Sequence, residues 1–101
     1  MKQNITAIIY DRKGNVLSMG KNSYVKTHPL QAHYAQRVGL GKKIFLHAEI
    51  NAIIKLRQPE KAYKMLIIRT LANGSYGCAK PCPICTEAIT TLFPSLIVEH
   101  T

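Results

Sequence analysis

The stretch HAEINAIIKLR, residues 47–57, predicts a helix that is apolar around most of its circumference. Its residue types and its length suit a helix better than a strand, and Pro59 follows shortly after it and ends it. A helix that is apolar on most sides is buried, usually against a sheet. We therefore expect this segment to form the central helix of an α/β domain.

The sheet is predicted from the apolar runs on either side of this helix. KMLIIRTL, residues 64–71, is continuously apolar in its middle, which is typical of a central strand covered on both faces. Residues 4–10 and 16–20 predict a β-hairpin around a glycine-containing turn. A last strand is expected over residues 95–100.

Two further helices complete the predicted order of elements. An amphipathic helix is expected over residues 30–38, with Pro29 at its start, and another over residues 83–93. The elements then follow in the order β-β-α-α-β-α-β. This alternation predicts a single α/β domain over residues 1–101, built on a mixed sheet.

Composition and charge limit the classes of partner. The 101 residues suit one small domain, and the net charge of +9 favours anionic partners such as nucleotides or nucleic acid. The alternative, that scattered lysines only keep the protein soluble, stays open. No apolar run approaches the ~18–20 residues that span a bilayer. The N-terminus lacks a signal-peptide pattern, so we expect a cytoplasmic protein without membrane contact.

Cys82 and Cys85 in KPCPIC, residues 80–85, are the first chemical signal. Taken alone, the pair fits a redox site, half of a structural zinc site, or part of an active site. A four-cysteine zinc site would need a second CxxC, which the sequence lacks. A finger-like site would need histidines after the cysteines at short spacing, and none stands there. We expect the third cysteine, Cys78, to be a small buried or half-buried residue and no ligand.

His47 is the second chemical signal, because it opens the apolar helix with Glu49 two residues after it. Burying two polar side chains is unfavourable unless they have partners or a function. The dipole at a helix N-terminus favours neutral imidazole and thiolate, the forms that bind metal. If the two helices lie side by side on the sheet, His47, Cys82 and Cys85 converge. Three protein ligands with a fourth position open for water are typical of catalytic zinc.

The combined pattern H-x-E…P-C-x-x-C, here at residues 47–49 and 81–85, is the signature of zinc-dependent nucleobase deaminases. The chain therefore resembles the cytidine and deoxycytidylate deaminase superfamily over nearly its whole length, and in particular its compact, phage-like members. The resemblance implies a three-layer α/β/α fold, here truncated at its C-terminus. It also implies that Asn22 contacts the sugar and that the backbone N–H of Ala48 holds the pyrimidine carbonyl. Lys80 departs from the residue types usual before the Pro-Cys pair, which leaves the substrate open.

The resemblance implies hydrolytic deamination of a cytosine nucleoside or nucleotide to the uracil product, with ammonia released. Zn²⁺ would be held by His47, Cys82 and Cys85, and Glu49 would carry the protons. The aromatic content of 7% favours a small substrate over single-stranded DNA or RNA, whose deaminases need stacking aromatics. A polynucleotide deaminase acting on cytosine or adenine and a non-catalytic zinc-binding interaction domain are the alternatives.

Two lesser expectations concern loops and edges. Lys26 and His28 are interpreted as ordinary loop residues, with a phosphate contact as the alternative, and Tyr24 and Tyr76 as loop tyrosines that could stack on a base. We also expect a homo-oligomer, since relatives are commonly oligomeric and an open strand edge invites pairing with another chain.

Overall fold

The computed structural model describes residues 4–41 and 45–101, which form a mixed five-stranded sheet and three α-helices. The predicted α/β class and the predicted order of the main elements are confirmed. A short 3₁₀ turn at Pro59–Lys61 and a two-residue strand inside the predicted loop before Cys82 are additions. The elements are β1 (Asn4–Tyr10), β2 (Val16–Lys21), α1 (Pro29–Arg37), α2 (Ala48–Ile54), β3 (Lys64–Thr70), β4 (Tyr76–Gly77), α3 (Pro83–Leu92) and β5 (Ile97–His100).

Strand β3 lies in the middle of the sheet, as its apolar sequence predicts. It pairs antiparallel with β1 along its whole length, and β1 pairs antiparallel with β2. The other edge of β3 is shared by two strands. The first half of β3 pairs parallel with β5, and its end pairs antiparallel with β4.

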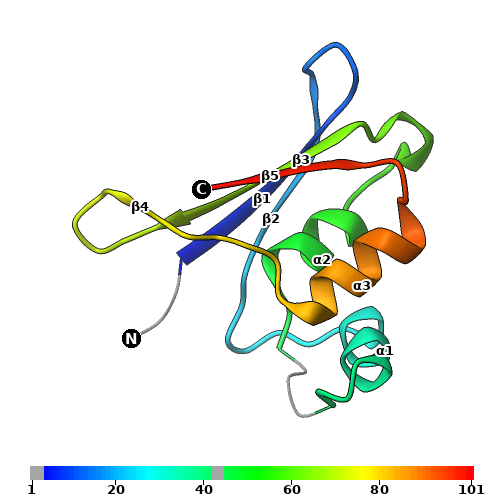
Figure 1. The fold of residues 1–101 in the computed structure, drawn as a ribbon, viewed down its shortest axis with the longest axis vertical. Coiled ribbons are helices and arrows are strands. Elements are labelled where there is room, and N and C mark those ends of the chain that lie inside the picture. The colour runs from blue at the N-terminus through cyan, green and yellow to red at the C-terminus, as the bar shows by residue number, and fades with distance from the viewer. Residues whose placement is uncertain (1–3, 42–44) are drawn as a thin grey trace.

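The core lies between the sheet and α2, which packs on β1 and β2. Alternate residues of β1 and β3 point to this side, and Ala7, Ile9, Met65 and Ile67 are all fully buried there. Helix α3 lies on the same side of the sheet, and α1 packs against α3 (Figure 1). A second apolar cluster joins α1, α2 and α3, and it includes Cys85.

The opposite face of the sheet carries no helix among the residues that the structure describes (Figure 1). Ile8, Leu66 and Ile68 on this face are only half-buried, and the side chain of Met19, which pairs with Ile8, is 47% exposed. The expectation that β3 is covered on both faces is therefore not met by the described helices. Of the three layers that the resemblance implies, the described residues form the sheet and the layer of helices on one of its faces.

Strand β2 approaches the backbone of α2 directly at Gly20. A Cβ atom added to Gly20 would lie 2.7 Å from the carbonyl oxygen of Ala48 and closer still to the backbone nitrogen of Ala52. Two residues earlier in β2, the hydroxyl of Ser18 donates a hydrogen bond of 2.9 Å to the carbonyl oxygen of Ala52. These contacts fix where α2 begins relative to the hairpin.

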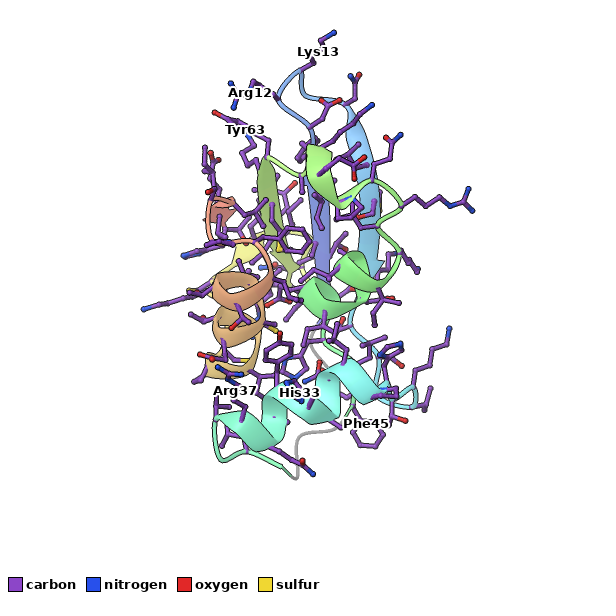
Figure 2. The ribbon with its side chains drawn as sticks, turned by 90° about the vertical axis from the view of Figure 1, so that its right-hand side faces the viewer. Arg12, Lys13, His33, Arg37, Phe45 and Tyr63 are labelled. Atoms are coloured by element: carbon purple, nitrogen blue, oxygen red, sulfur yellow. The ribbon has the colours of Figure 1, made fainter. Side chains whose placement is uncertain are left out.

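No helix in the described part of the chain has the length and apolar character needed to cross a membrane. The basic pair Arg12–Lys13 lies at the tip of the β1–β2 hairpin, where the Arg12 guanidinium lies 5.2 Å from the centre of the Tyr63 ring. This tip is at the end of the molecule remote from α1 (Figure 2). These two positive residues therefore lie far from Arg37 of α1 (Figure 2).

Candidate metal centre and its pocket

The predicted metal group is assembled by the N-termini of two helices. His47 is the N-cap of α2 and Cys82 is the N-cap of α3, and both have extended backbone conformations. The Nδ1 atom of His47 lies 3.3 Å from the sulfur of Cys82 and 3.3 Å from that of Cys85. All three potential ligand atoms lie within 4.8 Å of one another, so the predicted convergence is found.

The geometry of the group fits zinc. With Zn–S and Zn–N bonds of about 2.3 and 2.05 Å, a tetrahedral site separates a nitrogen and a sulfur ligand by about 3.5 Å. The two observed nitrogen–sulfur distances of 3.3 Å are close to this value. The donor set of one imidazole and two thiols is also one that zinc prefers. His47, Cys82 and Cys85 are therefore positioned to coordinate the ion.

The pKa values of the two cysteines are shifted in opposite directions, which leaves one negative charge to attract a cation. The thiol of Cys85 donates to the sulfur of Cys82, and this hydrogen bond, helped by His47, lowers the pKa of Cys82 to about 4. The same hydrogen bond and burial raise the pKa of Cys85 well above its ordinary value. Cys82 is thus a thiolate at neutral pH, and metal binding would release the proton that remains on Cys85.

The loop that leads to Cys82 is fastened to the sheet by Thr101. The carbonyl oxygen of Thr101 accepts a hydrogen bond of 2.7 Å from the backbone of Ala79, and its hydroxyl donates one of 2.6 Å to the carbonyl of Gly77. The Thr101 amide in turn donates to the carbonyl of Ile67 in β3 at 3.0 Å. The central strand therefore determines where the chain enters α3.

Glu49 lies in the first turn of α2 and is only 5% exposed. Burial raises the pKa of its carboxyl group, against the opposing effects of hydrogen bonds to the backbone and to Cys85. A buried carboxyl group with a raised pKa is suited to accept a proton and return it near neutral pH.

A pocket of about 530 Å³ opens onto the metal group. His47, Glu49 and Cys82 line it, whereas Cys85 is fully buried behind them. The remaining wall is apolar and aromatic with a few polar groups, and it includes Ile5, Asn22, Tyr24, Phe45, Ala48 and Lys80. A mostly apolar pocket with a few convergent polar groups is typical of small-molecule sites.

The two predicted substrate residues, Asn22 and Ala48, both line this pocket. The side-chain oxygen of Asn22 accepts a hydrogen bond of 3.0 Å from the backbone of Ile5, so the residue also holds the start of β1. Ala48 is the first residue of α2 and is 1% exposed. Their contacts with substrate remain predictions.

The structure also bears on the expectations for Lys26, His28 and Cys78. Lys26 and His28 are not among the pocket-lining residues, and the Nδ1 atom of His28 accepts a hydrogen bond from the backbone of Leu30 as the N-cap of α1. Cys78 lies outside the metal group as expected, but it is exposed, so the expectation that it is buried or half-buried is wrong.

Some residues of the pocket wall and of the site have contacts that the sequence did not predict. Phe45 and Lys80 line the pocket, and Gln31 accepts a hydrogen bond from the backbone of His47. Lys80 could have been found from its place two residues before Cys82. Tyr24 lines the pocket, and Tyr76 does not belong to that lining.

Comparison with known proteins adds one finding. A family model described as the cytidine and deoxycytidylate deaminase zinc-binding region matches residues 1–100. No curated protein matches the chain significantly. The matched region contains all three residues of the metal group.

Proposed function

The chain belongs to the family of cytidine and deoxycytidylate deaminases, and we propose that it removes the amino group of a free cytosine nucleotide or nucleoside by hydrolysis of the C4–N bond. The observation that carries this proposal is the position of Glu49. Its carboxyl group is buried beside the three metal ligands and lines the same pocket. A purely structural zinc site has no use for such a carboxyl group, which argues against a non-catalytic interaction domain.

Each protein group has a defined part in the proposed reaction. A zinc ion held by His47, Cys82 and Cys85 would supply an activated water, because zinc lowers the pKa of such a water to about 7. Glu49 accepts the proton of that water and passes it to N3 of the base, while the water oxygen bonds to C4. Glu49 then accepts the remaining proton of that oxygen and delivers it to the amino group, and the C4–N bond breaks with release of ammonia. One carboxyl group thus acts first as base and then as acid.

Two residues of the pocket wall would orient the base and the sugar. The backbone N–H of Ala48 belongs to the first turn of α2, where amide groups lack partners within the helix. We propose that it donates to the pyrimidine carbonyl. Asn22, at the end of the wall nearest β1, would contact the sugar through its amide group.

The charge of the pocket supports a nucleotide over a nucleoside. Glu49 is the single acidic residue among the lining residues, and Lys80 adds an exposed ammonium group to the wall. A positive group at the mouth of a pocket attracts and binds phosphate. We therefore assign the proposed phosphate contact to Lys80 instead of Lys26 or His28.

One observation favours the polynucleotide alternative. The aromatic side chains of Tyr24 and Phe45 line the pocket yet are 42% and 46% exposed. Exposed rings beside a deaminase pocket could stack on the nucleotides that flank a target base, each stack contributing about 1–3 kcal/mol. An oligonucleotide substrate therefore belongs in any test of function.

The function is tested by ammonia release from cytidine, deoxycytidine, their monophosphates and a short single-stranded oligonucleotide. The Lys80→Met protein is expected to lose about tenfold more kcat/KM on a monophosphate than on its nucleoside, because a charge-assisted contact is removed. The Lys13→Met protein, changed at the remote hairpin tip, is the matched control. Equal losses on both substrates would remove Lys80 from the phosphate contact, and turnover of the oligonucleotide alone would favour the alternative function.

We also propose that the protein is a homo-oligomer. The uncovered sheet face, which carries Ile8, Met19, Leu66 and Ile68, supports this, since exposed apolar faces of a sheet are commonly buried against another molecule. We expect sedimentation analysis to give a mass of at least two chains, and we expect Met19→Lys to shift the protein toward the mass of one. A monomeric mass for the unchanged protein at high concentration would contradict the proposal.

The proposal includes the extent of the domain and the location of the protein in the cell. One sheet and the helices on one side of it include every described helix and strand, which supports a single deaminase domain over residues 1–101. A cytoplasmic location is supported by the two cysteines of the metal group, because thiolate ligands persist in a reducing compartment. Cell fractionation would test it, and recovery outside the cytoplasm would contradict it.

A further inference from the structure

Helix α1 supplies none of the three metal ligands, yet one of its side chains reaches the metal group. Gln31 is fully buried, and its Oε1 atom accepts a hydrogen bond of 3.1 Å from the backbone N–H of His47. We propose that Gln31 is a positioning residue for the zinc centre, which acts by fixing the backbone of His47. This inference rests on the zinc site and goes beyond the proposed reaction, because it concerns metal affinity.

The backbone at His47 needs an external acceptor. His47 is the N-cap of α2, with an extended backbone (φ −81°, ψ 155°), and its side chain makes no capping hydrogen bond to the helix. The Nδ1 atom of the imidazole lies instead beside the two cysteine sulfurs, at 3.3 Å from each. The N–H of an N-cap residue lies outside the helical hydrogen-bond ladder, and a backbone N–H that is shielded from water needs a hydrogen-bond partner. Gln31 provides that partner from a different helix.

The residue before His47 is held by the same stretch of chain. The N–H of Leu46 donates to the carbonyl of Lys26, and the carbonyl of Leu46 accepts from the N–H of Ser23, both at 2.9 Å. Residues 23–31 thus fix the chain at Leu46 and His47 through three hydrogen bonds. With its backbone held, the imidazole has few orientations left, and the metal site is ordered before the ion arrives.

The residue type at position 31 supports a specific role. The neighbouring core positions of α1 are apolar, Tyr34 and Ala35, and the cluster around them includes Leu46 and Ile50. Burying the amide group of a glutamine among such residues costs desolvation, which an apolar residue would avoid. The acceptor oxygen of Gln31 offsets this through the backbone of a metal ligand.

Groups that orient metal ligands without contacting the metal themselves typically lower metal affinity by about 10–100-fold when they are removed. Gln31→Met keeps a long unbranched side chain but has no strong acceptor, so we expect zinc affinity to fall by about tenfold or more. Gln36→Met is the matched control, because Gln36 is an exposed residue of the same helix. Its affinity should equal that of the unchanged protein.

The experiment is a competition titration of zinc between each protein and a chromogenic chelator, together with the absorption spectrum of the Co²⁺-loaded proteins. We expect Gln31→Met to bind zinc more weakly and to show altered Co²⁺ ligand-field bands, which a change in packing remote from the metal would not produce. Unchanged affinity and bands in a folded Gln31→Met protein would overturn the proposal.

A measurement on the unchanged protein covers the case in which Gln31→Met does not fold. Amide hydrogen exchange at His47 should be slowed by at least about 10²-fold relative to an unstructured peptide, since a hydrogen-bonded amide exchanges only when its hydrogen bond opens. Exchange at the unprotected rate would show that the hydrogen bond to Gln31 is not formed. None of these readouts needs turnover, so absence of deaminase activity would count against the proposed function and leave this inference to be decided separately.

Discussion

The Glu49→Gln protein is expected to bind zinc as tightly as the unchanged protein and to release ammonia at least about 10²-fold more slowly. Glutamine has nearly the shape of glutamate, but it can neither take the proton of the attacking water nor deliver one to the amino group. Because Glu49 is buried and its pKa is raised by that burial, replacing it with a neutral side chain should not unfold the helix.

Three measurements separate catalysis from structure in this test. Initial rates of ammonia release report the chemistry, metal analysis reports the zinc content, and thermal unfolding reports the fold. Glu60→Gln makes the same change at an exposed residue of the 3₁₀ turn and should leave all three unchanged. If Glu49→Gln kept its zinc and still turned over at the unchanged rate, the proposed proton transfers would be wrong.

The second large effect is expected for Cys85→Ser, which should lower zinc affinity by more than the 10–100-fold typical of a supporting group. Cys85 is fully buried, and its sulfur lies 3.3 Å from Nδ1 of His47. A serine hydroxyl at that place is a poor zinc ligand, and the thiol that lowers the pKa of Cys82 is also lost. We expect the purified variant to be nearly metal-free and to gain little thermal stability from added zinc.

The control for this variant is a second cysteine of the same chain. Cys78 is exposed and lies outside the metal group, so Cys78→Ser should retain zinc through dialysis against a chelator that strips Cys85→Ser. Comparison of the two separates loss of a ligand from a general effect of removing a thiol. Equal zinc retention in both variants would exclude Cys85 as a ligand.

The convergence of the metal group could be predicted from sequence because it follows from local rules. His47 and Cys82 each stand where a loop enters a helix, and helices that pack on the same side of a sheet bring such ends together. The covering of β3 could not be predicted in this way. Leu66 and Ile68 are apolar on the open face, and an apolar run shows that a face avoids water without showing what covers it.

The role of Gln31 could not be predicted from the sequence for a different reason. A glutamine between apolar residues of an amphipathic helix is normally interpreted as a solvent-facing residue. Its burial depends on how α1 lies against the segment that leads to His47, 16 residues away. Such a contact is tertiary, and no spacing rule within one helix predicts it.

The direct backbone contact at Gly20 makes the metal centre sensitive to mutation at a distance. A methyl group there would press on the carbonyl of Ala48, the residue directly after His47, so the helix would have to shift together with its ligand. A misplacement of about 1 Å can lower the rate of a well-oriented reaction by about 10²-fold. Substitution of Gly20 by any larger residue is therefore expected to impair the metal centre, although Gly20 belongs to neither the metal group nor the pocket wall.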